Sequence, residues 1–268
     1  MDTTVLAGAL GVLIGLTLAL TGAGGGVLAI PLLVFGLHLP VQQAAPVGLV
    51  AVGLTAALGA GLGLRQGIVR YRAAAVIGFA GMCVAPLGVL AAQHLPNRPL
   101  LAAFAGVLIY TALRMLRTPA VVNLDEAQLP CRVEAGQSRL SWTRQCARAL
   151  LGTGLMSGFL SGLLGVGGGF VIVPALTRHT NLSLPSVQAT SLAVIALVSI
   201  SGVTAAALHG AVPWAVAVPF SLGAGAGLLS GRRVAQNLNP TVLQSAFAGF
   251  ALLVALLMLA RALGWLPT

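Results

Sequence analysis

The sequence predicts an all-α, polytopic transmembrane helical protein, built from two inverted-topology repeats with Gly-rich broken or re-entrant helices. Three observations predict this fold class: the composition, the lengths of the apolar segments and an internal repeat. Of the 268 residues, 58% are hydrophobic and only 7% are charged, whereas a soluble domain carries about 25% charged residues. So few charges cannot cover a water-facing surface, and we expect an integral membrane protein.

The two halves of the chain repeat at an offset of about 143 residues. The clearest match joins two glycine-rich stretches, residues 22–26 (GAGGG) and 165–169 (GVGGG). The other matches keep one order in both halves: Pro31 with Pro174, Leu39-Pro40 with Leu184-Pro185, Gln43-Ala44 with Gln188-Ala189, Gly67 with Gly210, and residues 103–106 with 246–249. Apolar composition alone does not explain this order, so we expect a true repeat.

Each half contains five apolar segments, whose lengths decide how many can span a bilayer. They are residues 5–21, 24–38, 41–64, 71–93 and 98–117 in the first half, and 147–164, 167–179, 185–208, 212–231 and 241–261 in the second. A span needs about 20 residues, so the last three segments of each half qualify and the first two do not comfortably. Each half therefore has five short crossings, or three crossings plus a re-entrant hairpin with its tip at the glycines.

Both counts are odd, so the second half enters the membrane from the opposite side and the repeats are inverted. We expect repeats at 1–117 and 147–268, joined by a polar linker at 118–146 that holds three of the four acids. With a cytoplasmic linker, twelve of the fourteen arginines lie inside and only Arg98 and Arg261 outside. This agrees with the excess of arginine in cytoplasmic loops and places both termini outside.

Several other classes of function and partner are not expected. The arginines lie between apolar segments without an aromatic platform, so no nucleic-acid partner is expected. Three cysteines without tight spacing indicate neither a disulfide nor a zinc site, and no metal or cofactor is predicted. The chain lacks the H-E-x-x-H and P-loop motifs and a rhomboid-like G-x-S-G motif, so no enzyme is expected. No basic region precedes the first apolar segment, so we expect that segment to be retained.

The glycine-rich breaks are the candidate substrate site. Inverted repeats with broken helices are typical of secondary transporters, whose sites lie near the bilayer midplane. A helix that starts after each break would present free N–H groups and a partial positive charge, which suits an anion. The glycines could instead only allow close helix packing. The candidate binding residues here are Gly24, Gly25, Gly26, Gly167, Gly168 and Gly169.

Polar side chains near the breaks could complete the site. No Asp or Glu lies within the ten apolar segments, although cation and proton transporters commonly place carboxylates there. An anionic or neutral substrate therefore fits better. Uncharged candidates for binding it are Gln43, Gln188, Thr190 and Ser191, which could equally hold helices together. His209 could act as an outer gate or proton carrier, or simply lie at the membrane interface.

The two glycine-proline stretches also carry a family resemblance. Residues 22–31 (GAGGGVLAIP) and 165–174 (GVGGGFVIVP) resemble the G-x-G-G-G-x₄-P signature of the TauE/SafE sulfite exporter family. The resemblance extends over essentially the whole chain. It implies a permease of the bacterial cytoplasmic (inner) membrane for a sulfur-containing anion, such as sulfite, sulfoacetate or another organosulfonate. Both export and uptake are attributed to the family.

We therefore expect a secondary transporter that moves a small sulfur-containing anion by alternating access. Its expected partners are that anion and membrane lipid, with a homodimer as a further possibility. Two alternatives stay open at this point: a passive anion channel, and a membrane protein with no transport role of its own. The substrate, the direction of transport and the coupling ion do not follow from the residues.

Overall fold

The structure is a computed structural model that describes residues 3–21, 26–117, 131, 143–235 and 240–263. Within this part of the chain the fold is almost entirely helical, which confirms the predicted all-α class. The helices are α1 (Thr3–Thr21), α2 (Ala29–Gly36), α3 (Val41–Arg65), α4 (Tyr71–His94), α5 (Asn97–Arg117), α6 (Arg144–Leu164), α7 (Gly169–His179), α8 (Leu184–Leu208), α9 (Trp214–Ala235) and α10 (Pro240–Ala262).

Six of these helices are long and apolar enough to cross a membrane: α1, α3, α4, α6, α8 and α9. The prediction that the first segment of each half is too short was therefore wrong. Helix α6 has 21 residues because it starts a turn earlier than expected, where the Thr143 side chain accepts a hydrogen bond from the Cys146 N–H at 3.1 Å. In contrast, α2 and α7 have only 8 and 11 residues. Each half thus pairs a full-length helix with a short one.

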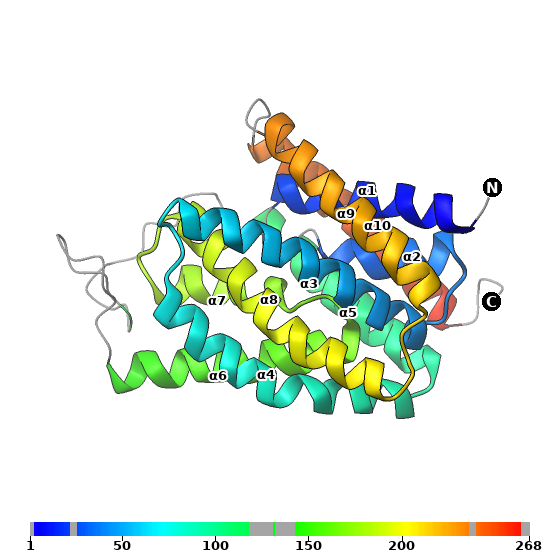
Figure 1. The fold of residues 1–268 in the computed structure, drawn as a ribbon, viewed down its shortest axis with the longest axis horizontal. Helices are drawn as coiled ribbons and strands as arrows, with labels where there is room; N and C mark the ends of the chain where they lie inside the picture. The colour runs from blue at the N-terminus through cyan, green and yellow to red at the C-terminus, as the bar shows by residue number, and fades with distance from the viewer. Residues whose placement is uncertain (1–2, 22–25, 118–130, 132–142, 236–239, 264–268) are drawn as a thin grey trace.

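The two halves are interleaved rather than side by side (Figure 1). Helix α1 packs along α9 of the other half, and its counterpart α6 packs along α4. The central helices α3 and α8 pack on each other, as do α5 and α10. If each helix is replaced by its counterpart in the other half, the same pairs of helices remain in contact. The helix contacts therefore follow the sequence repeat.

Glycines at the helix contacts show which helices run in the same direction. A Cβ added to Gly15 of α1 would lie 2.6 Å from the Leu228 N of α9, and one added to Gly231 would lie 2.7 Å from the Ala19 Cβ. Contacts that advance along both chains mean that α1 and α9 are parallel. Such close approach of backbones is how small residues pack membrane helices.

Helices α3 and α8, which correspond in the repeat, run in opposite directions. A Cβ on Gly53 would lie 2.6 Å from the Ser199 Cβ, and one on Gly63 would lie 3.0 Å from the Ala189 Cβ. As the contacts advance along α3 they therefore move back along α8. This antiparallel packing supports an inverted relation between the halves, whose orientation across a membrane stays a prediction.

The loops after α3 and α8 have the same backbone geometry. Gly67 and Gly210 both adopt a left-handed conformation, with φ of 69° and 65°. The N–H of the next residue then donates to a carbonyl inside the preceding helix: Ile68 to Gly63 at 3.2 Å, and Ala211 to Ala206 at 3.0 Å. Both helices therefore end in the same glycine cap.

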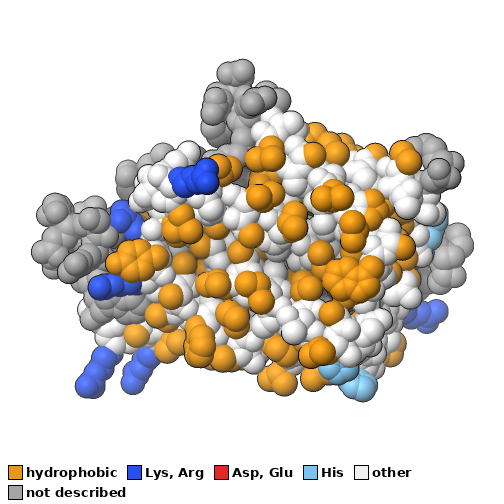
Figure 2. All heavy atoms as spheres, viewed as in Figure 1, with side chains coloured by type: hydrophobic (Ala, Val, Ile, Leu, Met, Phe, Trp, Pro, Cys, Tyr) orange, Lys and Arg blue, Asp and Glu red, His pale blue; other side chains and the backbone are white. Residues whose placement is uncertain are grey.

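The outer surface is apolar between two ends. Large hydrophobic side chains are exposed on several helices, among them Leu13, Phe79, Leu87, Ile200 and Leu222. Figure 2 shows such side chains spread over one face, while most of the arginines visible there lie towards the end that holds the α3–α4 loop and the start of α6 (Figure 1). An apolar band with arginine at one end is the surface of a protein set in a bilayer.

A disulfide joins Cys131 to Cys146, so the prediction of no disulfide was wrong. Both residues are fully buried. The Cys131 N–H donates to the His179 carbonyl at 3.2 Å, which places this linker residue between the start of α6 and the end of α7. No sequence pattern indicated this pair, because its separation of 15 residues is bridged only through the fold. Most of the linker lies outside the described residues.

Candidate functional site

Glycine geometry starts α7 inside the protein. Gly165 ends α6 with φ of 70°, and Gly168 precedes α7 with φ of 71°; Gly167 is left-handed too. An L-residue with a side chain would lose roughly 1–2 kcal/mol in this conformation. The chain can therefore reverse within a few residues only because these positions are glycine.

The reversal brings the start of α7 to the middle of α6. A Cβ added to Gly168 would lie 2.7 Å from the Ser157 carbonyl oxygen, and Ser157 lies seven residues before the end of α6. At 1.5 Å per residue this is about 10 Å from that end. Residues 165–169 are all buried. Helix α7 therefore begins within the thickness that α6 spans and does not cross it fully.

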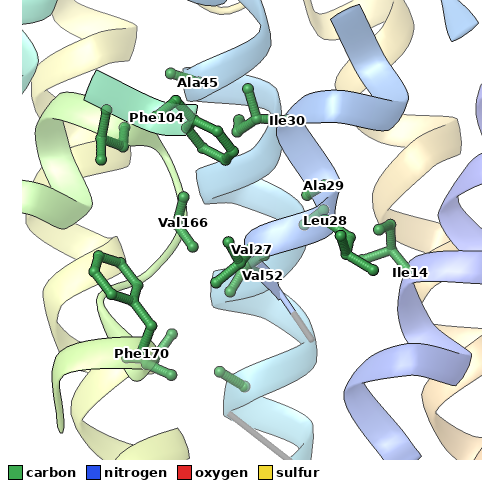
Figure 3. Close-up of a cluster of buried hydrophobic side chains, with 14 of the residues drawn as sticks. Ile14, Val27, Leu28, Ala29, Ile30, Ala45, Val52, Phe104, Val166 and Phe170 are labelled. Carbon is green, nitrogen blue, oxygen red and sulfur yellow. The ribbon is translucent and has the colours of Figure 1, made fainter. Parts of the chain in front are cut away.

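The two glycine-rich breaks meet at the centre of the molecule. The backbone of Gly26 packs on Val52 and on the Val166 carbonyl, which a Cβ there would approach to 3.1 and 3.2 Å. Gly167 packs on the same Val52 side chain and on Ile195. Figure 3 shows Val27, Val52 and Val166 turned towards one another at this contact. The sequence prediction that both breaks belong to one region therefore agrees with their packing, although residues 22–25 with Gly24 and Gly25 lie outside the described residues.

The N-terminus of α7 presents polar backbone groups in this apolar surrounding. Val171 and Ile172 donate their N–H groups to the Gly168 carbonyl at 3.0 and 3.2 Å. No described residue accepts a hydrogen bond from the N–H of Gly169 or Phe170. Buried N–H groups at the positive end of a helix are suited to bind an anion.

Two buried serine hydroxyls lie on the helices that flank the breaks. Ser161 of α6 and Ser191 of α8 are fully buried, and neither hydroxyl has a hydrogen-bond partner among the described residues. Ser191 lies one helical turn before Ile195 and so shares its face of α8, the face that packs on Gly167. Sequence reasoning found Ser191 but missed Ser161, whose carbonyl also accepts the capping hydrogen bond from Gly165 at 2.8 Å.

The other predicted side chains do not gather at this centre. Gln43 is exposed near the start of α3, and Gln188 is half-buried near the start of α8. Because α3 and α8 are antiparallel, these two glutamines lie at opposite ends of the bundle. The Thr190 hydroxyl accepts a hydrogen bond from the Arg70 N–H at 3.0 Å and so fastens the α3–α4 loop. His209 is exposed at the end of α8, with Nδ1 2.8 Å from the Ala205 carbonyl oxygen.

Carboxylates do not contribute to the centre. None of the described residues is Asp or Glu. Nor do His, Cys, Asp or Glu side chains form a group that could hold a metal ion in this part of the chain. A ligand bound at the breaks would therefore meet backbone N–H groups, hydroxyls and apolar side chains.

Comparison with known proteins places this arrangement in a family. The model of the sulfite exporter TauE/SafE family matches residues 7–258. The chain belongs to this family. A probable membrane transporter protein of Xylella fastidiosa strain Temecula1 is 30% identical over 220 residues, covering 80% of this chain and 77% of that protein. The probable membrane transporter protein YdhB of Bacillus subtilis is 26% identical over 234 residues, covering 87% and 91%.

No solved structure matches the chain. The match to the TauE/SafE family covers helices α2 to α9 completely and most of α1 and α10, and it includes both glycine breaks. With six helices in the described part of the chain long and apolar enough to span a bilayer, this family member is a multi-pass membrane protein of a transporter family.

Proposed function

We propose that this family member is a secondary transporter that moves a small sulfur-containing anion, such as sulfite, sulfoacetate or another organosulfonate, by alternating access. The observation that carries the proposal is the buried start of α7, where the N–H groups of Gly169 and Phe170 have no acceptor among the described residues. This helix end lies against the first glycine break, in a described region without carboxylates.

The proposed binding centre combines backbone and hydroxyl donors. In it, Gly24, Gly25, Gly26, Gly167, Gly168 and Gly169 let the anion approach the backbone closely. The hydroxyls of Ser161 and Ser191 would add hydrogen bonds without adding charge. An anion is favoured over a cation because the N–H groups and the helix dipole stabilise negative charge, whereas a cation would lack a counter-charge there.

The glutamines and Thr190 then act at the two mouths rather than at one site. In the proposed topology the start of α3 faces outside and the start of α8 faces the cytoplasm. Gln43 would meet the anion at the outer mouth, and Gln188 with Thr190 at the inner mouth. His209 belongs to the outer mouth, as a gate or proton carrier. Alternating access would open one mouth while the packed helices close the other.

The proposed location is the bacterial cytoplasmic membrane, with the linker inside and both termini outside. The uneven distribution of the arginines supports this orientation. We propose transport rather than catalysis as the role of the chain, without a cofactor, and lipid as its surrounding. Association into a homodimer stays a proposal.

Ligand-dependent thermal stabilisation of the detergent-purified protein tests the proposal. The panel is sulfite, thiosulfate, sulfate, sulfoacetate, taurine, phosphate and acetate, with sodium and potassium salts compared. A ligand at 100 times its dissociation constant should stabilise the folded state by about 2.7 kcal/mol. Selective stabilisation by sulfite or a sulfonate is the expected result. Stabilisation by a cation or an uncharged solute, with none by any sulfur anion, would mean that the breaks only pack helices.

Uptake into proteoliposomes separates a transporter from a channel. A transporter exchanges labelled substrate against an excess of unlabelled substrate inside, and its flux saturates. Flux that never saturates and cannot be driven against a gradient would instead indicate a passive anion channel. Ligand binding without any flux would leave a membrane protein that only senses the anion.

A further inference from the structure

Each of the two short helices is contacted at its C-terminal end by a residue from a distant part of the chain. At the end of α2, the Arg261 guanidinium of α10 donates to the Val34 carbonyl at 3.4 Å and lies over the Phe35 ring, 5.6 Å from its centroid. At the end of α7, the Cys131 N–H of the linker donates to the His179 carbonyl at 3.2 Å. Both contacts satisfy a carbonyl that the last turn of a helix leaves without an intrahelical partner.

The two contacts differ in their chemistry. A guanidinium stays charged under all ordinary conditions, so the contact of Arg261 with α2 is permanent. The contact with α7 depends on where Cys131 is fixed, and a disulfide joins Cys131 to Cys146 in the first turn of α6. The end of α7 is therefore attached to the start of α6 only while these two cysteines are oxidised.

Without the disulfide, the contact between Cys131 and α7 is weak. Its backbone part is the hydrogen bond to His179, in an isolated β-bridge that pairs Cys131 with Thr180. One backbone hydrogen bond does not offset the conformational entropy that a chain segment loses when it is ordered. Reduction of the disulfide should therefore release Cys131 from α7, whereas oxidation fixes it there.

Helix α7 carries the backbone part of the proposed binding centre at its other end. The N–H groups of Gly169 and Phe170 belong to that centre, and the helix follows the left-handed Gly168. Only four of its 11 residues are buried: Gly169, Phe170, Ile172 and Leu176. A short helix attached through glycines can turn about them, because small terminal residues absorb such changes in backbone angles. The contact at the C-terminal end of α7 then decides whether the helix can move.

We propose that Cys131 and Cys146 form a redox modification site that controls transport through the inner mouth. In the dithiol form, which a reducing cytoplasm maintains, Cys131 is released and α7 moves during each transport cycle. In the disulfide form, the end of α7 is attached to the start of α6 and transport stops. This proposal rests on the proposed function and adds a means of regulating the same site.

Oxidation of the pair proceeds by exchange with a small disulfide such as glutathione disulfide. One cysteine thiolate attacks a sulfur of the small disulfide, forms a mixed disulfide and releases one small thiol. The second cysteine thiolate attacks the protein sulfur of the mixed disulfide, closes the Cys131–Cys146 bond and releases the second small thiol. Two cysteine thiols are thus oxidised and one small disulfide is reduced, and the two protons leave on the small thiols. Both cysteines are fully buried in the disulfide form, which slows its reduction.

Hydrogen–deuterium exchange with mass spectrometry tests the attachment of α7 without any transport. The purified protein carries Cys83→Ser, which removes the third, exposed cysteine. It is compared after treatment with glutathione disulfide and after treatment with dithiothreitol. Amides in the last turn of α7 should exchange about tenfold faster or more in the dithiol form. The peptide that covers the end of α2 is the internal control, because Arg261 contacts it in both forms and its exchange should stay the same.

Exchange of radiolabelled sulfite and of radiolabelled sulfoacetate across proteoliposomes tests the control of transport. The oxidant is removed before reconstitution, and a maleimide gel shift after the assay verifies that sulfite has not cleaved the disulfide. The disulfide form should exchange substrate about tenfold more slowly or less than the dithiol form, and dithiothreitol should restore the rate. Cys131→Ser and Cys146→Ser, each in the Cys83→Ser background, should keep the dithiol rate after oxidant treatment. Two single variants are used so that a folding defect in one does not decide the result.

The outcomes separate this proposal from the proposed function. Equal exchange of the α7 amides in the two redox forms, or equal transport rates, would overturn the redox control and leave the transporter standing. An equal change at the ends of α2 and α7 would also overturn it, because the disulfide would then act on the whole protein and not on α7. Absence of flux of either anion in the dithiol form would overturn the proposed function and the control of transport with it.

Discussion

Replacing Gly168 with alanine tests two properties of the glycine that precedes α7: its left-handed backbone conformation and its close packing on α6. The change adds one methyl group at a position with φ of 71°, and its Cβ would lie 2.7 Å from the Ser157 carbonyl oxygen and 3.1 Å from the Ser157 Cβ. The left-handed conformation costs roughly 1–2 kcal/mol. Forcing α6 and the turn apart costs about 1–3 kcal/mol more. Gly168→Ala should therefore lower the free energy of unfolding by about 2–5 kcal/mol.

Two other glycines serve as matched controls for this change. Gly210 has φ of 65° and nothing within 4 Å of an added Cβ, so Gly210→Ala carries only the conformational cost of roughly 1–2 kcal/mol. Gly152, in the interior of α6, also has open space at its Cβ and no left-handed φ. Gly152→Ala should stabilise the protein by roughly 0.5–1 kcal/mol, because alanine favours a helix over glycine.

Thermal unfolding of the purified proteins in one detergent measures this order. The expected sequence of stability is Gly152→Ala, wild type, Gly210→Ala and then Gly168→Ala. A loss at Gly168 no larger than at Gly210 would mean that the turn does not pack on Ser157, and the depth at which α7 starts would have to be revised.

Four further predictions concern helix contacts, the disulfide and the α3–α4 loop. Gly158→Val should prevent close packing of α6 on α4, since even a Cβ there would lie 2.5 Å from the Gly81 Cα. We expect this variant to lose its monodisperse peak in size-exclusion chromatography. The control Gly106→Val, which has open space at its Cβ, should keep the peak. With a cytoplasmic linker, Cys131 and Cys146 should be thiols in cells and form their disulfide only after exposure to air. Acid trapping of the thiols followed by a maleimide gel shift, in a Cys83→Ser background, measures their redox state. A disulfide in the trapped cells would contradict a cytoplasmic linker. Once formed, the disulfide should stabilise the protein by about 3 kcal/mol relative to Cys146→Ser, given its 15-residue separation. Thr190→Val should lower the free energy of unfolding by roughly 1–3 kcal/mol, because the Arg70 N–H loses the Thr190 hydroxyl as acceptor. The control Thr204→Val, at an exposed threonine, should change stability by less than about 0.5 kcal/mol. Equal losses in the two variants would mean that the Thr190–Arg70 hydrogen bond is not formed.

The long helices could be predicted closely because local hydropathy determines them. The expected segment at 71–93 became Tyr71–His94, and that at 185–208 became Leu184–Leu208. The start of α6 could not be placed so well, because its first turn is polar and depends on the Thr143 cap. The extent of α7 was predicted almost as well, since the expected segment at 167–179 became Gly169–His179. Its depth was not predictable, because only the packing of Gly168 on Ser157 places the start of this helix beside the middle of α6.

The candidate site was predictable in its backbone part and less so in its side chains. Repeated glycines pointed to both breaks, and Gly26 and Gly167 do pack on the same valine. The prediction that Gln43 and Gln188 belong to one site was wrong because the repeats are related by inversion. Equivalent positions on the antiparallel helices α3 and α8 therefore lie at opposite ends of the bundle. Ser161 gave no sequence signal, because only the fold shows that its hydroxyl is buried without a partner among the described residues.

The interleaved pairing of α1 with α9 affects how the protein is made. Helix α1 leaves the ribosome long before its principal partner α9, which begins only at Trp214. At about 5–20 residues per second, synthesis of the intervening chain takes on the order of ten seconds or more. During that time the glycine face of α1, including Gly11 and Gly15, must be covered by lipid or by the insertion machinery. Assembly is therefore completed from the C-terminal half, and an N-terminal half made alone would leave α1 without the surface on which it packs.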